Sequence, residues 1–309
     1  MKLFDLHCDT ATECEKLNYS MQSNPLHWDF SRISTLSESS RQITAVYIPD
    51  ETTEKDAWSY ALRVFSFIRS QNIPLISTAD DLRFVPHGIL LAVENGKLIG
   101  NDLSKLSHPS MHDVVYITLT WNGINRIGNG ALSGKKDGLT PFGCEAVREM
   151  IRLGILPDVS HLNERGFWDV AELSEGYSLL ASHSNSYTIH QHPRNVTDLQ
   201  FTAIRDSGGL LGVNLCDAHL GKHSFGQLER HIDHFWSLGG EETVALGMDL
   251  DGTPIPSEWG GVEVACRLYE YFLMKGYPQE LIDKLFFENS YSFFMKTLTR
   301  RKKCIRIGT

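Results

Sequence analysis

LFDLHCD, residues 3–9, is typical of a β-strand that ends in polar side chains. Successive side chains of a strand point to opposite faces, so we expect His7 and Asp9 to lie side by side on one face. An imidazole and a carboxylate that converge from one strand can form half of a divalent-metal site. Asp5, two residues earlier on that face, could hold this pair in place. The same residues could instead cap a turn, so the metal interpretation depends on the other strands.

The composition is that of an ordinary globular enzyme. The chain has 309 residues, of which 41% are hydrophobic and 22% charged, enough to bury a large core. Its net charge of −9 argues against a nucleic-acid partner, because phosphate binding needs a concentrated basic face. The one basic run, residues 300–303, is expected to be a short solvated tail. No stretch approaches the roughly 18 apolar residues of a membrane span, so we expect no membrane partner.

Two features predict a cytoplasmic location. Met1-Lys2 leads directly into the first strand and Asp5 interrupts any apolar leader core, so no secretory leader is expected. The cysteines are scattered without a CxxC pair, which is typical of free thiols in a reducing compartment. They are Cys8, Cys14, Cys144, Cys216, Cys266 and Cys304.

Strand-like runs alternate with helix-like stretches along the whole chain. Strands are expected at residues 3–9, 42–49, 88–95, 114–121, 155–160, 177–184, 209–215 and 243–250. Helices are expected at residues 56–70, 140–154, 164–173, 197–208 and 227–238. This α/β alternation without a linker predicts a single (β/α)8 TIM barrel over residues 1–309, with a doubly wound open sheet as the alternative.

Side chains that can bind a metal ion, a proton or a substrate lie at the ends of the expected strands, where such barrels carry their active sites. In chain order they are His7 and Asp9, Glu94, Trp121 and Asn122, His161, His183, and Asp249; strands two and seven contribute none. Glu94 ends an apolar run, where a buried carboxylate needs a cation partner. Together these residues predict a two-metal site, with ions roughly 3.5–4 Å apart and a hydroxide between them. Zn²⁺ suits this nitrogen and oxygen ligand set, and Mn²⁺ or Fe²⁺ would also be compatible.

Short strings between residues 5 and 252 carry a resemblance to a known family. They are DLHCD, LLAVENG, TLTWN, GLTPFG, DVSH, ASHSN, HPRNVTD and GMDLDG, in that order. In these strings the chain resembles the membrane dipeptidase (renal dipeptidase) family, peptidase family M19 of the amidohydrolase superfamily. The resemblance implies that His7 and Asp9 bind one zinc ion, that Glu94 bridges two ions, and that His161 and His183 bind the second.

The resemblance also implies substrate-binding residues. Arg194 would bind the terminal carboxylate of the substrate, a role that suits a bidentate guanidinium, although a surface salt bridge is the simpler interpretation of the residue alone. Asp249 would contact the free amino group and pass a proton to the leaving amine. Asp251, expected on the same strand face, is the second candidate for that role.

Position 121 departs from the family pattern. The family carries a histidine after TLT, which is thought to steady the developing oxyanion, and this chain has Trp121. An indole N–H can donate a hydrogen bond but cannot titrate, and Asn122 beside it could act as the donor instead. Trp121 could equally serve packing alone. The departure therefore leaves the substrate open.

Some residues with ligand-like spacing are not expected in the site. The pairs His219/His223 and His231/His234 fall among polar residues after strand seven and are expected on the surface. Cys8 lies between two expected ligands, but strand alternation turns it toward the core.

The leading hypothesis is a binuclear-zinc dipeptidase in which a metal-bridging hydroxide attacks the peptide carbonyl, with a dipeptide as its partner and a homodimer as a further implication of the resemblance. A second hypothesis keeps the metals but assigns an N-acyl amino acid, lactam or ester as the substrate. A third is a metal-binding homologue without catalysis, which the presence of Asp249 beside a complete ligand set disfavours.

Overall fold

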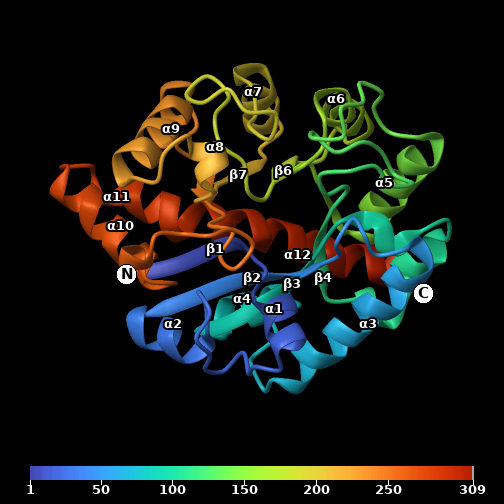
Figure 1. Cartoon of the computed structure of the whole chain (residues 1–309), viewed down its shortest axis with the longest axis horizontal. Coiled ribbons are helices and arrows are strands. Elements are labelled where there is room, and N and C mark those ends of the chain that lie inside the picture. The colour runs from blue at the N-terminus through green and yellow to red at the C-terminus, as the bar shows by residue number, and fades with distance from the viewer. Residues whose placement is uncertain (308–309) are drawn as a thin grey trace.

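Eight parallel strands close into a barrel (Figure 1). The computed structural model describes the backbone of residues 1–307 and the side chains of residues 1–301. The strands are β1 (Lys2–Cys8), β2 (Ser39–Tyr47), β3 (His87–Glu94), β4 (Val114–Thr118), β5 (Leu156–Asp158), β6 (Leu180–Ala181), β7 (Leu210–Val213) and β8 (Val244–Leu246). Each strand pairs with the next, and Asp5 of β1 pairs with Leu246 of β8 to close the ring. The TIM-barrel prediction is confirmed, and the open sheet is excluded.

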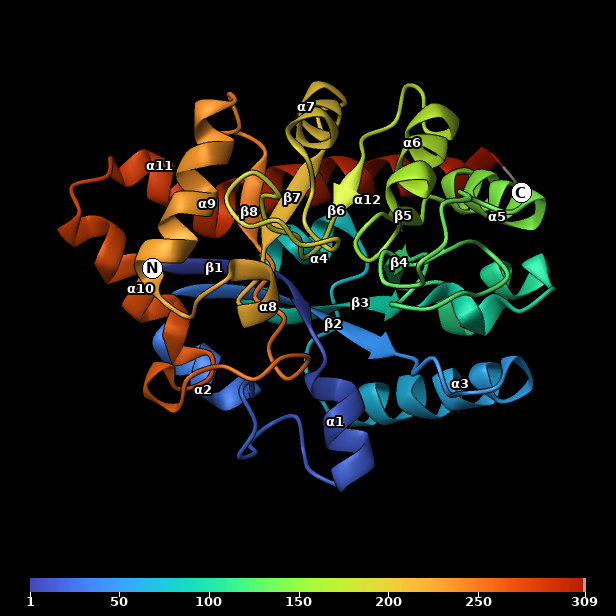
Figure 2. The same ribbon diagram turned by 45° about the horizontal axis from the view of Figure 1, so that its top comes forward.

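Helices cover the outside of the barrel, as the alternating pattern predicted (Figure 2). They are α1 (Thr10–Leu17), α2 (Phe30–Leu36), α3 (Glu54–Ser70), α4 (Ala79–Phe84), α5 (Pro141–Leu153), α6 (Glu164–Leu173), α7 (Asp198–Asp206), α8 (Asp217–Leu220), α9 (Phe225–Ser237), α10 (Glu263–Met274), α11 (Gln279–Asp283) and α12 (Asn289–Ile307). Several of them, including α5 and α7, begin at a capping side chain. Thr140 caps α5 ahead of its proline, and Thr197 forms a capping box with Gln200 at the start of α7.

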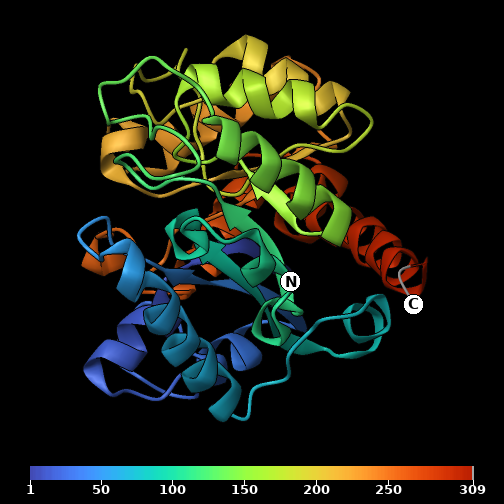
Figure 3. The same cartoon turned by 90° about the vertical axis from the view of Figure 1, so that its right-hand side faces the viewer.

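A long C-terminal helix closes the bottom of the barrel, at the N-terminal ends of the strands. Figures 2 and 3 show α12 crossing that end. The ring of Phe294 in α12 stacks on Phe4 at the start of β1, with 5.4 Å between centroids. Phe287, in the π-helical turn (Lys284–Glu288) before α12, packs against the same ring at 6.4 Å. The opposite end of the barrel is therefore the one free to form a site.

The basic run near the C-terminus is part of α12. Arg301 is buried and donates a hydrogen bond to the carbonyl oxygen of Val114 at 3.0 Å. The prediction of a solvated tail is therefore wrong at Arg301, because its side chain completes the packing of α12 against β4. Arg300 is exposed, and the side chains of residues 302 and 303 lie outside the described part of the chain.

The first strand does not alternate strictly. Its register against β2 shifts between Asp5 and Cys8, as in a β-bulge. Leu6 packs inside the barrel and Cys8 packs in the outer layer, while His7 joins the site at the top. Asp5 accepts hydrogen bonds from Gln42 (2.6 Å) and from the backbone N–H of Met248 (2.7 Å). Asp5 therefore joins β1 to β2 and to the segment after β8, and its side chain forms no hydrogen bond with His7 or Asp9, which it was expected to support.

The described cysteines form no disulfide bonds. Cys8, Cys14, Cys144, Cys216 and Cys266 are free, as predicted, and Cys8 lies in the core. Cys304 lies outside the described side chains. Within residues 1–307, every helix is too short or too polar to cross a bilayer.

Candidate active site

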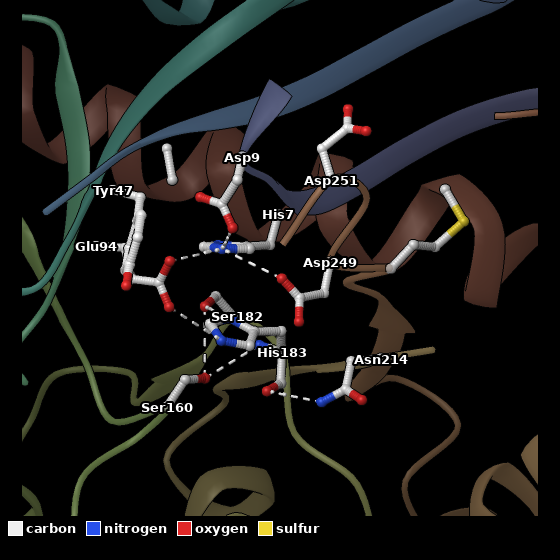
Figure 4. A network of polar contacts seen from close by, with 12 residues as sticks. His7, Asp9, Tyr47, Glu94, Ser160, Ser182, His183, Asn214, Asp249 and Asp251 are labelled. Carbon is white, nitrogen blue, oxygen red and sulfur yellow. Dashed lines mark hydrogen bonds and ion pairs between the residues drawn. The ribbon is translucent and has the colours of Figure 1, made fainter. Parts of the chain in front are cut away.

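The expected ligands meet at the C-terminal ends of the strands; Figure 4 shows His7, Asp9, Glu94, His183 and Asp249, and His161 lies beside Glu94 and His183. They come from His7 in β1, Asp9 after it, Glu94 at the end of β3, His161 after β5, His183 after β6 and Asp249 after β8. All six are buried, none more than 8% exposed. Strands β5, β6 and β8 are shorter than predicted. Each ends two or three residues before its ligand, so His161, His183 and Asp249 lie in the loops that follow.

Glu94 lies between two groups of side chains. Its Oε2 is 3.4 Å from Nε2 of His7, which in turn is 3.7 Å from Oδ2 of Asp9. Its Oε1 is 3.0 Å from Nε2 of His161 and 3.6 Å from Nε2 of His183. One carboxylate thus faces a different set of potential ligands with each of its oxygens, which is the arrangement expected of a bridging ligand.

Hydrogen bonds fix the tautomers of His7 and His161. Nδ1 of His7 lies 2.8 Å from the hydroxyl of Tyr116, which donates its own proton to the carbonyl oxygen of Leu6. Nδ1 of His161 lies 3.1 Å from Oδ1 of Asn122. In both cases Nδ1 must carry the proton, which leaves a lone pair on Nε2. Such outer partners are typical of metal-binding histidines.

A serine fixes the third histidine in the same way. Ser182 Oγ donates to the Asp158 carboxylate at 2.6 Å and lies 2.8 Å from Nδ1 of His183, so Nδ1 is again the donor. Nε2 of His183 is then 2.8 Å from Nε2 of His161, with a lone pair on each nitrogen. Two lone pairs at this distance repel each other unless a cation or a proton lies between them.

Other buried atoms also lack partners. Among the described residues, Nε2 of His7 and Oδ1 of Asp9 are buried without a hydrogen bond. Burying polar atoms in this state is costly, and a bound cation would satisfy them. His7 belongs to two compact groups of potential metal ligands. One contains Glu94 and His183, and the other contains Asp9 and Asp249. The donor set therefore fits divalent metal ions.

Burial shifts the pKa values of two carboxylates and of two imidazoles in the site. Burial and the neighbouring Glu94 raise the pKa of Asp9 to about 6. Burial, with Asp9 and Glu94 nearby, raises the pKa of Asp249 well above its ordinary value. Burial also holds the pKa of His161 and that of His183 well below the usual range, so both imidazoles are neutral and their lone pairs are available.

The backbone at the site is strained. His161 (φ 68°) and Asp249 (φ 62°) are non-glycine residues in the left-handed region, where such conformations persist only if the surroundings impose them. Asp249 is held by its N–H, which donates to the carbonyl oxygen of His7 at 3.1 Å. A Cβ at Gly252 would collide with the carboxylates of Asp9 and Asp249, so only glycine fits beside them.

The two aspartates after β8 have different surroundings. Oδ1 of Asp249 is 3.8 Å from Nε2 of His7, and Figure 4 shows its carboxylate turned toward that ring. The Asp251 carboxylate points away from His7 in the same view. It accepts hydrogen bonds from Thr10 and from the backbone N–H of His27 (2.7 Å). The geometry thus favours Asp249 over Asp251 as the residue that meets a substrate.

Arg194 is buried, at 3% exposed, and forms no ion pair with any described carboxylate. Its Nη2 donates to the carbonyl oxygen of His183 at 3.3 Å, and its Nε has no partner. Burial lowers the pKa of Arg194 to about 10, so the group stays cationic at neutral pH. A surface salt bridge is therefore excluded. A buried, charged guanidinium without a carboxylate partner is suited to bind an anionic group of a ligand.

A cavity of about 260 Å³ opens over the site. Its lining includes Asp9, Glu94, Trp121, Asn122, His161, Asp249 and Asp251, together with Tyr47, Cys216 and His219. Trp121 packs edge-on against Tyr47, with 5.2 Å between ring centroids, and lies 6.3 Å from the ring of His161. Trp121 and Tyr47 thus form an aromatic wall, while Asn122 is engaged in orienting His161.

Two residues that line the cavity were not predicted from the sequence. Tyr47 ends β2 and His219 follows β7, the two strands that were expected to add nothing. His219 and His231 are buried, at 9% and 0% exposed, so their assignment to the surface is wrong. The signal for His231 lies in the apolar face of α9, where Leu228 and Ile232 share its buried side, whereas His219 lies in the short helix α8. Their spacing partners His223 and His234 are partly exposed.

The fold and the site together define a class of protein: a TIM-barrel hydrolase that depends on metal ions. The sequence model "Membrane dipeptidase (Peptidase family M19)" matches residues 1–303. The chain belongs to this family of metal-dependent peptidases.

Relatives and solved structures agree with this assignment. An uncharacterised protein of Klebsiella pneumoniae, from the pqqA 5′ region, is 41% identical over 182 residues, which cover 55% of this chain and 67% of the relative. The crystal structure of a metallopeptidase of family M19, dipeptidase AC, is 26% identical with a TM-score of 0.89 and covers 96% of this chain and 99% of its own. A metallopeptidase from Rhodobacter sphaeroides, liganded with a phosphinate mimic of L-Ala-D-Ala, is 26% identical with a TM-score of 0.87 over the same shares.

Proposed function

We propose that this protein is a binuclear zinc dipeptidase. His7 and Asp9 would hold one ion, His161 and His183 the other, and Glu94 both. The observation that carries the proposal is the position of Glu94, whose two oxygens lie 3.4 Å from Nε2 of His7 and 3.0 Å from Nε2 of His161. Neutral imidazoles and carboxylates are ligands that suit Zn²⁺. Bound there, the ions would polarise the scissile carbonyl and supply a hydroxide nucleophile at neutral pH.

The remaining residues would bind the two ends of a dipeptide. Arg194, buried and without a carboxylate partner, would bind the terminal carboxylate. Oδ1 of Asp249 lies 3.8 Å from Nε2 of His7. Asp249 would bind the free amino group of the substrate and pass a proton to the nitrogen of the leaving amine. Asn122 would act through His161 by holding its Nδ1–H, so we infer a positioning role for it.

The size of the cavity supports a small substrate. At about 260 Å³ it lies below the roughly 300–1,000 Å³ typical of sites for drug-sized ligands. Trp121 and Tyr47 would border the substrate on the side of Glu94 and His161. Because a buried cation and a carboxylate would each bind one end, a chain extended at either end would leave one of them unsatisfied.

Metal analysis and a substrate panel test this proposal together. Metal content is measured by mass spectrometry, and hydrolysis is followed with L,L- and L,D-dipeptides, including L-Ala-D-Ala because the Rhodobacter sphaeroides relative binds its phosphinate mimic. We expect about two zinc ions per chain, cleavage of free dipeptides, and resistance of the N-acetylated dipeptides, which lack the amino group that Asp249 would bind.

Other results would change the assignment. Equal rates on free and N-acetylated dipeptides would move the substrate to the N-acyl amino acid class that Trp121 leaves open. Bound metal without turnover on any member of the panel would indicate a metal-binding homologue without catalysis. Absence of bound metal after purification with added zinc would contradict the ligand set.

A further inference from the structure

His219 belongs to the active-site cavity. It lies in α8, immediately after β7, and only 9% of it is exposed. Its side chain lines the same cavity of about 260 Å³ as Glu94, His161 and Asp249. The proposed reaction assigns it no task.

The hydrogen bonds of Asn214 determine which nitrogen of His219 carries the proton. Oδ1 of Asn214 accepts from Nδ2 of Asn185 (3.0 Å) and from the backbone N–H of Cys216 (3.1 Å). Its Nδ2 is therefore the donor, and it reaches the carbonyl oxygen of His183 (3.2 Å; Figure 4) and Nδ1 of His219 (3.2 Å). Nδ1 of His219 accepts, so the proton is on Nε2.

The surroundings keep this imidazole neutral. Burial and the nearby Arg194 guanidinium hold the pKa of His219 far below its ordinary value. His219 is therefore an Nε2–H donor, and among the described residues its ring hydrogen-bonds through Nδ1 alone.

Three contacts connect His219 with Arg194 through residues next to one or the other. The rings of His219 and His192 lie 4.9 Å apart, and the carbonyl oxygen of His219 accepts from Nδ2 of Asn195 at 2.8 Å. His192 and Asn195 flank Arg194 in sequence. In addition, Arg194 and the Asn214 side chain that orients His219 both donate to the carbonyl oxygen of His183. The neutral donor and the buried guanidinium thus belong to one hydrogen-bonded unit.

We propose that Nε2–H of His219 donates a hydrogen bond to the terminal carboxylate of the substrate, beside Arg194, and so helps to select substrates with a free carboxylate. This inference rests on the proposed dipeptidase function. A carboxylate has two oxygens with about four acceptor positions, so it can accept from a guanidinium and from an imidazole together. The carboxylates of Asp9 and Asp249 elsewhere in the cavity would repel the same group, which favours one orientation of the dipeptide.

The test compares the zinc-loaded wild type with His219→Phe and His219→Gln on a dipeptide and on the matching dipeptide amide. Phenylalanine keeps a ring against His192 but removes the donor, and glutamine retains an N–H. For His219→Phe we expect KM for the dipeptide to rise roughly 10- to 100-fold with kcat within about threefold. Glutamine should restore most of this loss, and the amide, which has no carboxylate, should be cleaved equally by all three proteins.

Each other outcome contradicts the inference. An unchanged KM for the dipeptide in His219→Phe would overturn it. An equal loss of kcat on dipeptide and amide would place the Nε2–H at the scissile carbonyl instead of the carboxylate. Zinc content and thermal unfolding are measured for each variant, and His219→Leu provides a second removal of the donor if the phenylalanine variant does not fold. If the wild type cleaves no dipeptide, the proposed function fails; if it does and the variants match it, only this inference fails.

Discussion

Asp249 and Asp251 lie two residues apart, both in the left-handed region of backbone conformation, yet their carboxylates have different partners. Asp249 faces His7, whereas Asp251 binds Thr10 and the backbone of His27. Both side chains line the cavity, so position alone does not distinguish them. Their hydrogen bonds do, because only Asp249 retains a carboxylate free to meet a substrate.

Asp249→Asn should lower kcat by about 100- to 10,000-fold, the usual contribution of a positioned proton donor. The amide has nearly the same shape and can still occupy the site, so zinc content should be unchanged. Asp251→Asn is the matched control: it should keep kcat within about threefold of the wild type and lower the thermal midpoint, because it weakens a contact between the loop after β8 and residues 10 and 27. Steady-state kinetics with metal analysis decides the matter, and near-normal turnover of Asp249→Asn would remove it from the mechanism.

The ligand-type residues of the site were predictable from sequence, because polar side chains that follow apolar strands meet at one end of a barrel. The residues that orient them were not. Tyr116 lies inside an apolar strand, and its hydroxyl finds His7 only because β4 and β1 face each other across the barrel interior. Ser182 precedes His183 in the sequence, and its link to Asp158 depends on the packing of β6 beside β5. Such contacts between distant segments leave no local pattern.

At the scale of elements, α9 is tied to the loops that carry the substrate-binding residues. His231, fully buried in α9, accepts from the backbone N–H of Ser186 (3.0 Å) with Nδ1 and donates from Nε2 to the carbonyl oxygen of Leu220 (3.1 Å). Ser186 begins the segment that leads to Arg194, and Leu220 ends α8, which carries His219. One neutral imidazole thus holds both segments against the same helix.

This contact makes stability depend on pH. Burial lowers the pKa of His231 to about 4, compared with about 6.5 in the unfolded chain. Above pH 6.5 both states are neutral; as the pH falls from 6.5 toward 4, only the unfolded state takes up the proton, so the free energy of unfolding decreases. The loss between pH 7 and pH 5 should be about 2 kcal/mol for this residue.

His231→Gln isolates the effect, because glutamine can keep both hydrogen bonds but cannot titrate. Urea unfolding of the two proteins at pH 7 and pH 5 should show a steeper loss of stability in the wild type. Parallel pH profiles would show that His231 is protonated to the same extent in both states.

The lengths of the elements show where local patterns stop being informative. The helix predicted at residues 164–173 has those bounds, because its cap and its apolar face are both local. The strand predicted at residues 177–184 is reduced to Leu180–Ala181. An apolar run indicates that a segment is buried, but it does not show where strand pairing ends. Pairing of β6 with β7 ends at Ala181, and the backbone N–H of His183 instead donates to Ser160. This end depends on the neighbouring strands.

At the scale of the whole molecule, the two ends of the barrel have opposite characters. Aromatic side chains of α12 and the turn before it fill the bottom, where Phe4, Phe287 and Phe294 pack together. At the top, Asp9, Glu94 and Asp249 are buried close to one another, with lone pairs of two imidazoles facing each other. The top therefore opposes folding unless cations occupy it, and metal binding and folding should be linked.

Removing the metal should consequently destabilise the whole barrel. At zinc concentrations about 1,000-fold above the dissociation constant, each site would contribute roughly 4 kcal/mol to the free energy of unfolding. For a chain of this size, dialysis against a chelator should lower the thermal midpoint by on the order of 10 °C, and added Zn²⁺ should restore it. Circular dichroism with metal analysis of the same samples measures the shift. Glu94→Gln, which removes the shared carboxylate, should show a much smaller zinc-dependent shift than the wild type. A wild-type midpoint that stays constant while the bound metal is lost would mean that the buried carboxylates are stabilised by protons instead.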